Sequence, residues 1–116
     1  MREHEVARFE SVGDVRVVSI VEGDDEVLEV RQRVTGPSAL LAYGEGEHSL
    51  RVLFAPAAVP GLLRAIGSAG SSSLAEYLAA EKNDAVDLMD LCDARGVAYT
   101  FVGIGPESGV QCRPAM

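Results

Sequence analysis

Three aspartates at helical spacing are the first candidates for a functional surface. Asp87, Asp90 and Asp93 recur every third residue within the segment 83–96. At 100° per residue they fall on one face of a helix, opposite its apolar arc. Their carboxylates could attract a basic protein partner. The alternative is an ordinary solvated face, which any amphipathic helix needs in order to stay in water.

A serine-rich connection is the second candidate. Ser71, Ser72 and Ser73 end the segment 67–73 and come directly before an expected helix. Exposed N–H groups at a helix start, together with serine hydroxyls, can hold a phosphate or a carboxylate. The segment lacks the glycine and lysine order of nucleotide-binding loops. Two interpretations therefore stay open: an anion-binding loop for a small ligand, or a flexible connection between helices.

His48 and Tyr99 complete a possible ligand site. His48 shares the strand parity of Leu50 and Val52, so it is expected to face the core or its rim. As a general base it would need a nucleophile or an orienting carboxylate within hydrogen-bond reach, which the sequence does not reveal. Tyr99 lies on a later expected strand, where core packing explains it equally well.

The sequence predicts no metal and no cofactor. The soft or borderline ligands His4, His48, Cys92 and Cys112 stand far apart. No two of them show the spacing of about two to five residues that marks structural zinc sites. In a reducing compartment both cysteines would be free thiols, and Cys92 would behave as a small buried hydrophobe.

Composition limits the classes of partner. The 116 residues carry 18 acidic and 10 basic side chains, a net charge of −8, so a nucleic acid would be repelled overall. Apolar runs are far shorter than the roughly 20 residues that a membrane helix needs. We therefore expect a cytoplasmic protein that binds neither nucleic acid nor membrane. Abundant alanine, glycine, valine and arginine are typical of a GC-rich bacterial genome.

The elements that must position these residues change type at Pro56. Before it, apolar and polar residues alternate with the period of half-buried strands; after it, apolar residues recur at three and four. The expected strands are 6–10, 14–21, 26–34, 39–43 and 48–55, the expected helices are 57–67, 74–82 and 83–96, and a last strand is 97–104.

Helix start and stop signals support the second half of this assignment. Ser73 followed by Glu76 forms an S-x-x-E capping box. Asn83 or Asp84 is expected to cap the next helix, and Gly96 to end it.

These elements predict an α+β fold. An antiparallel sheet of four or five N-terminal strands precedes two or three helices packed on one face, and a C-terminal strand returns to the sheet. The length fits a single domain, 1–116, with flexible ends at about 1–5 and 105–116. A brief strand at 110–113 is the alternative at the C-terminal end.

No motif fixes a chemistry, so the leading hypothesis is a non-enzymatic protein-binding or regulatory module that works as a homodimer. One alternative is a small-ligand sensor or an enzyme, with a pocket between sheet and helices. Another is an accessory subunit of a phage or secretion assembly. The protein-binding hypothesis uses the aspartate face, and the ligand-binding alternative uses His48, the 67–73 loop and Tyr99.

Overall fold

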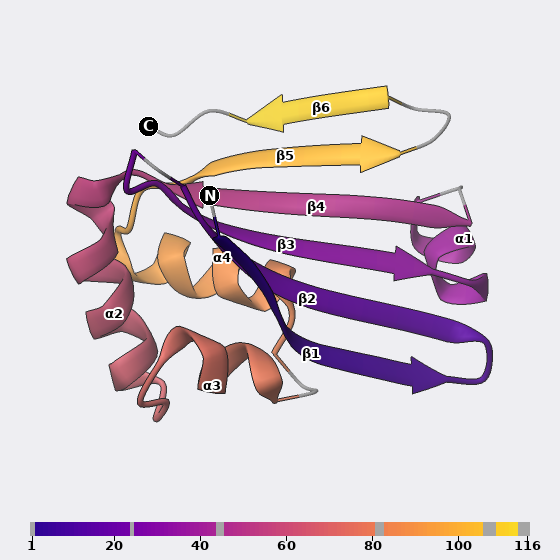
Figure 1. Ribbon diagram of the computed structural model, residues 1–116, viewed down its shortest axis with the longest axis horizontal. Helices are drawn as coiled ribbons and strands as arrows, with labels where there is room; N and C mark the ends of the chain where they lie inside the picture. The colour runs from indigo at the N-terminus through magenta and orange to yellow at the C-terminus, as the bar shows by residue number, and fades with distance from the viewer. Residues whose placement is uncertain (1, 24, 44–45, 81–82, 106–108, 114–116) are drawn as a thin grey trace.

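The computed structural model describes residues 2–23, 25–43, 46–80, 83–105 and 109–113. Within these ranges the chain forms one antiparallel sheet whose strands lie side by side in sequence order (Figure 1). The strands are β1 (Arg2–Ser11), β2 (Asp14–Glu22), β3 (Leu28–Thr35), β4 (Glu47–Phe54), β5 (Thr100–Gly105) and β6 (Gly109–Arg113). The helices are α1 (Pro37–Tyr43), the short 3₁₀ turn η1 (Pro56–Ala58), α2 (Val59–Ser68), α3 (Leu74–Ala79) and α4 (Ala85–Arg95).

The predicted α+β fold is confirmed. Four strands come first, α2, α3 and α4 pack against the sheet, and β5 returns to pair with β4 in antiparallel register. The strand that returns is therefore not at the edge, because β6 pairs with its outer side. None of the helices in the described ranges is long and apolar enough to cross a membrane.

The predicted change of structure at Pro56 is also confirmed. β4 ends at Phe54, and Pro56 opens η1, where a residue without an N–H costs no hydrogen bond. The Ser73 hydroxyl accepts the Glu76 N–H at 3.0 Å, as its cap position requires. Gly96 ends α4 with φ 69°, a left-handed conformation that favours glycine.

One predicted strand is wrong. The segment 39–43 belongs to helix α1, which runs from Pro37 to Tyr43. Gly36 turns the chain with φ 111°, and the Leu40 N–H then donates to the Gly36 carbonyl at 3.2 Å. Pro37 ends the β3 ladder as expected, but its fixed φ also suits the first turn of a helix. Alanine and leucine are strong helix formers, and this local preference decides the segment.

The first strand is longer than predicted and carries a bulge. β1 begins at Arg2 rather than Val6, and its pairing with β2 shifts between Glu5 and Ala7. The extra residue lets Val6 and Ala7, although adjacent, both pack against the buried cluster. The charged start of the chain therefore continues the sheet instead of standing apart from it.

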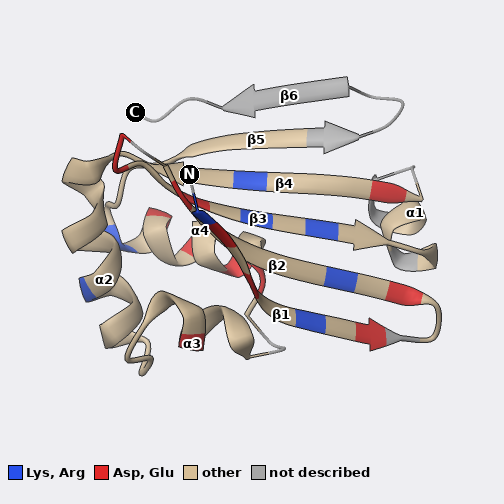
Figure 2. Ribbon diagram, viewed as in Figure 1, with Lys and Arg blue, Asp and Glu red and all other residues tan. Residues whose placement is uncertain are grey.

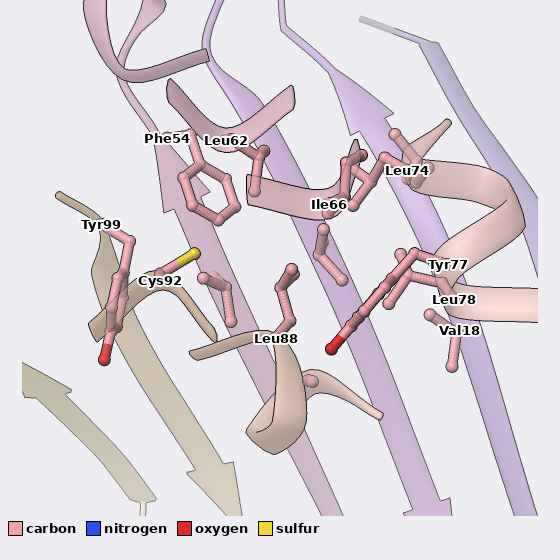
Figure 3. Close-up of a cluster of buried hydrophobic side chains, with 14 of the residues drawn as sticks. Val18, Phe54, Leu62, Ile66, Leu74, Tyr77, Leu78, Leu88, Cys92 and Tyr99 are labelled. Atoms are coloured by element: carbon pink, nitrogen blue, oxygen red, sulfur yellow. The ribbon is translucent and has the colours of Figure 1, made fainter. Parts of the chain in front are cut away.

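The buried cluster lies between the sheet and the helices. Its fully buried members come from β2, β3, β4, α2, α3 and α4, and Figure 3 shows them facing one another across that space. The largest of them are Phe54, Leu62, Ile66, Leu78 and Leu88. Helices α2, α3 and α4 cover one face of the sheet, and no helix of the described ranges covers the other (Figure 1).

A buried glutamine fixes α4 on this core. Gln32 is 3% exposed and interrupts the apolar face of β3. Its side-chain oxygen accepts the N–H of Ala85, the first residue of α4, at 2.9 Å. That N–H has no partner inside the helix, so Gln32 supplies the acceptor that a helix start buried against a sheet lacks.

Replacing Gln32 by leucine tests this contact. The Gln32→Leu variant leaves the Ala85 N–H buried without an acceptor, which costs about 1–3 kcal/mol. We expect its free energy of unfolding in urea to fall by that amount. The control is Arg33→Leu at the exposed neighbouring position of β3, expected to change stability by at most about 0.5 kcal/mol. Equal stability of Gln32→Leu and wild type would contradict the assignment.

Candidate functional site

The three aspartates of α4 have different surroundings. Asp87 and Asp84 form a reciprocal capping box: each side chain accepts the other's backbone N–H, at 2.9 and 3.0 Å. Asp93 accepts the Tyr99 hydroxyl at 2.9 Å. Asp90 is exposed on the same helix. Two of the three carboxylates thus stabilise the fold, and whether the face also binds a partner stays a prediction.

The serines of the α2–α3 connection also have structural contacts. Ser73 caps α3, and the Ser72 hydroxyl donates to the Glu76 carboxylate. The Ser71 N–H donates to the Ile66 carbonyl at 3.1 Å, which closes the C-terminal turn of α2. Ser72 and Ser73 are exposed and Ser71 is half-buried.

His48 and Tyr99 lie on the helix-covered side of the sheet. His48 is 8% exposed, and its imidazole packs close to Gly103 of β5: a Cβ at position 103 would lie 3.5 Å from Nε2. Tyr99 is 6% exposed and packs its ring against Phe54, with centroids 6.4 Å apart. Both residues face the buried side, as the strand parity predicts for His48.

The structure does not gather these residues into one site. His48 stands near the start of β4, beside α1, whereas the α2–α3 connection lies at the opposite end of the sheet (Figure 1). The space between sheet and helices is filled by the buried cluster, including Leu62 and Leu88 at 0% exposure (Figure 3). The pocket expected there is therefore occupied by side chains of the protein itself.

The uncovered face of the sheet gathers a different set of residues. Because side chains alternate along each strand, the in-register pairing aligns Ser19, Arg31, Arg51 and Val102 in one row across β2 to β5. The next row contains Val17, Arg33 and Ser49. Figure 2 marks in blue the positions of the basic residues along β1 to β4; those of β1, β3 and β4 include Arg8, Arg31, Arg33 and Arg51.

A groove of about 480 Å³ runs along these rows. Glu3, Glu5 and Arg8 of β1 form one side, and Arg51 of β4 lies at the other. A second hollow of about 250 Å³ adjoins it and shares Arg8, Val17 and Arg33. We call the first of these the arginine groove; its polar members are Glu3, Glu5, Arg8, Ser19, Arg31, Gln32, Arg33, Ser49 and Arg51.

Ion pairs neutralise three of the four arginines. Arg8 lies 3.4 Å from Glu5 and 3.7 Å from Glu10. Arg33 lies 2.9 Å from Glu47. Such half-exposed pairs contribute little to stability, about 0–1 kcal/mol each, so a ligand can replace a partner at small cost.

Arg31 is the most enclosed of the three paired arginines. Its guanidinium pairs with Glu3 at 3.1 Å and also donates to the Glu29 carboxylate. The Glu3 pair reaches across β2, from the edge strand to β3. The aliphatic parts of the Glu3 and Arg31 side chains lie across β2. They account for the burial of Ser19 and Val21, at 9% and 3% exposure, on the face that the helices do not cover.

Arg51 is the exception. It is half-buried and stands directly opposite Arg31 in the β3–β4 register. Within the described part of the chain, no carboxylate lies within 4.0 Å of its guanidinium. Like charges at directly opposed strand positions repel, so this pair costs stability that an external anion would recover.

The sequence contained part of the signal for this groove. Alternation places Arg31, Arg33 and Arg51 on the outward side of their strands, where charged residues are ordinary. What it does not contain is the strand pairing that brings them into adjacent rows. The Arg31–Arg51 opposition depends on the turn through α1, where the sequence predicted a strand.

The remaining chemistry-bearing residues form no cluster among those described. No group of three histidines, cysteines, aspartates or glutamates there could hold a metal ion. Cys92 is a free thiol at 0% exposure, as the sequence predicts. The side chain of Cys112 lies outside the described residues. A smaller hollow between α2 and α4 has Arg64 and Arg95 at its rim.

The Cys92 thiol should be unreactive in the native protein. Burial, with a contribution from the Asp93 charge, raises the pKa of Cys92 from 9.0 to about 11. At about pH 8 this lowers the thiolate fraction about 100-fold. In a Cys112→Ser variant, Ellman's reagent should therefore react at least that much more slowly with the folded chain than with the urea-unfolded chain. Equal rates would show that Cys92 is accessible.

No protein-family model, no curated protein and no solved structure matches this chain, so the arginine groove rests on its own geometry.

Proposed function

We propose that the chain is a non-enzymatic protein-binding module whose docking surface is the uncovered face of the sheet. The arginine groove carries this proposal, since it combines charged, hydroxyl and aliphatic side chains in one hollow of about 480 Å³. Six strands about 4.8 Å apart and roughly eight residues long span on the order of 700 Å². A standard protein interface buries about 800 Å² on each partner, so the face has a suitable size.

The arrangement of candidate catalytic groups favours binding over catalysis. A general base acts on a nucleophile within hydrogen-bond reach, and the base candidate His48 is on β4, away from Ser71, Ser72 and Ser73. Tyr99 is engaged with Asp93 beside α4. The polar groups that do share a hollow are arginines, glutamates and serines with no activated nucleophile among them.

The partner class follows from the charges. Glu3, Glu5 and Glu29 surround the arginines, and the whole chain carries −8. A nucleic acid presents one negative charge at every phosphate, which this distribution repels. A protein partner can instead alternate charges to match the face. We infer that the module works in the cytoplasm of a bacterium.

Self-association is part of the proposal, and an aliphatic end supports it. Val12, Leu40 and Leu41 are 94%, 56% and 90% exposed; Val12 lies in the β1–β2 turn, whose Gly13 is close to Pro37 at the start of α1, and Leu40 and Leu41 lie on α1. Val12 also has φ 48°, a conformation costing a β-branched residue roughly 1–2 kcal/mol. Exposed aliphatic residues kept at a strained turn suggest a contact between two copies, which we propose as the homodimer interface.

Affinity capture with matched surface variants tests the docking face. Ser49→Tyr fills the arginine groove, Ala94→Tyr places the same bulk on exposed α4, and Asp90→Arg reverses a charge on the aspartate face. Wild type should capture a stoichiometric partner from a lysate of the source organism. The amount captured by Ser49→Tyr should fall about tenfold or more, whereas the other two variants should capture as much as wild type. Loss only with Asp90→Arg would move the interface to α4, and retention by all three would refute the proposal.

Light scattering after size exclusion tests self-association. Wild type should show about twice the 12.2 kDa chain mass, and Val12→Asn/Leu41→Asn should be monomeric. Asparagine tolerates positive φ, so position 12 keeps its turn, and the double variant should retain the far-UV circular dichroism of the folded wild type. Ser49→Tyr should remain dimeric. A monomeric wild type, or a dimeric double variant, would contradict this interface.

A further inference from the structure

The unpartnered guanidinium of Arg51 has surroundings that define a ligand. It is half-buried between Arg31 on β3 and Val102 on β5. Opposed side chains in adjacent strands have Cβ atoms only about 4.5–5.5 Å apart, so the two cationic stems stand next to each other. Arg31 has two carboxylates of its own, whereas none lies near Arg51 among the described residues.

Among the described residues, Arg51 is therefore the one arginine of the groove without a carboxylate within 4.0 Å. Arg8 and Arg33 have acidic neighbours within 4.0 Å, as Arg31 does. A carboxylate bound at Arg51 would give each of the four groove arginines an acidic neighbour. A guanidinium binds a carboxylate through two parallel N–H···O bonds, and these are among the stronger hydrogen bonds in proteins. The Ser49 hydroxyl, two residues earlier on the same side of β4, offers a further donor.

We propose that Arg51 binds a carboxylate from an acidic segment of the partner protein, seated along the arginine groove. This inference rests on the proposed docking face and names the chemistry of what docks there. The groove, at about 480 Å³, is much larger than a lone carboxylate and lies within the range of sites for drug-sized ligands, which leaves room for the residues next to the carboxylate. The aliphatic side chain of Val17 lies beside the arginines and offers apolar contact to the rest of the segment.

Charge balance favours a carboxylate over a phosphate. Among the described residues of the groove a single guanidinium is unpaired, and a carboxylate brings a single charge. A phosphate group brings up to two charges and would also meet Glu3, Glu5 and Glu29 near the same rows. Those glutamates repel the second charge while leaving the first compensated by Arg51 and Arg31.

The probe is a seven-residue peptide with three central glutamates between glycines and serines, titrated into ¹⁵N-labelled full-length protein. We expect it to shift the amides of 31–33 and 49–51, and a matched glutamine peptide to shift none of them. Arg51→Gln should weaken binding about tenfold or more. Arg64→Gln, at an exposed arginine on α2, should bind as wild type does. Glu3→Gln removes a partner of Arg31 and should strengthen binding.

Four outcomes would overturn the carboxylate site. They are no shift with the glutamate peptide, equal shifts with the glutamine peptide, unchanged affinity in Arg51→Gln, and tighter binding of inorganic phosphate to the same amides. The spectrum of Arg51→Gln must retain native dispersion, which the removal of a like-charge pair favours. Arg51→Lys keeps the positive charge but lacks the two parallel N–H donors of the guanidinium, so it should lose part of the affinity.

The same variants separate this inference from the proposed function. If Ser49→Tyr loses the captured partner while Arg51→Gln retains it, the docking face stands and the carboxylate contact is wrong. If Ser49→Tyr also retains the partner, the docking face itself is wrong. Loss of the partner in both, with capture unchanged for Arg64→Gln, supports both proposals together.

Discussion

One-sided coverage of a sheet with in-register strands is the constraint on which the other features depend. Helices α2, α3 and α4 pack against one face, and most of the apolar residues that β2 to β5 place on that face join the buried cluster. The residues that alternate with them along each strand lie on the opposite face, where their nearest contacts are their cross-strand neighbours. The arginine groove is thus a consequence of the same alternation that builds the core.

The sequence predicts most of the fold because its signals are local. Pro56, the Ser73 cap and the Gly96 stop each act within a few residues, and each lies where expected. The segment 39–43 was predicted wrongly because four apolar residues in a row fit a short strand and a short helix equally. The groove could not be predicted, since it requires knowing which residue of β3 stands opposite Arg51.

Polar residues that suggest chemistry in the sequence stabilise structure here. Ser73 and Asp87 satisfy N–H groups at helix starts, and Asp93 accepts the Tyr99 hydroxyl. Gln32, which looks like an interruption in an apolar strand, supplies the acceptor for α4. Each accepts a hydrogen bond from a donor that the structure brings to it: an N–H at a helix start or a tyrosine hydroxyl. Arg51 lacks such an explanation, and for that reason it is the more informative residue.

The glutamates around Arg51 give the face selectivity as well as balance. An uncompensated cluster of four arginines would attract any polyanion, whereas paired arginines lose most of their long-range field. A single unpaired guanidinium then acts only at short range, where the fork geometry distinguishes a carboxylate from other groups. A net charge of −8 adds a general repulsion that only a well-matched segment overcomes. Specificity on this face therefore comes from the charges that are already paired, and affinity from the one that is not.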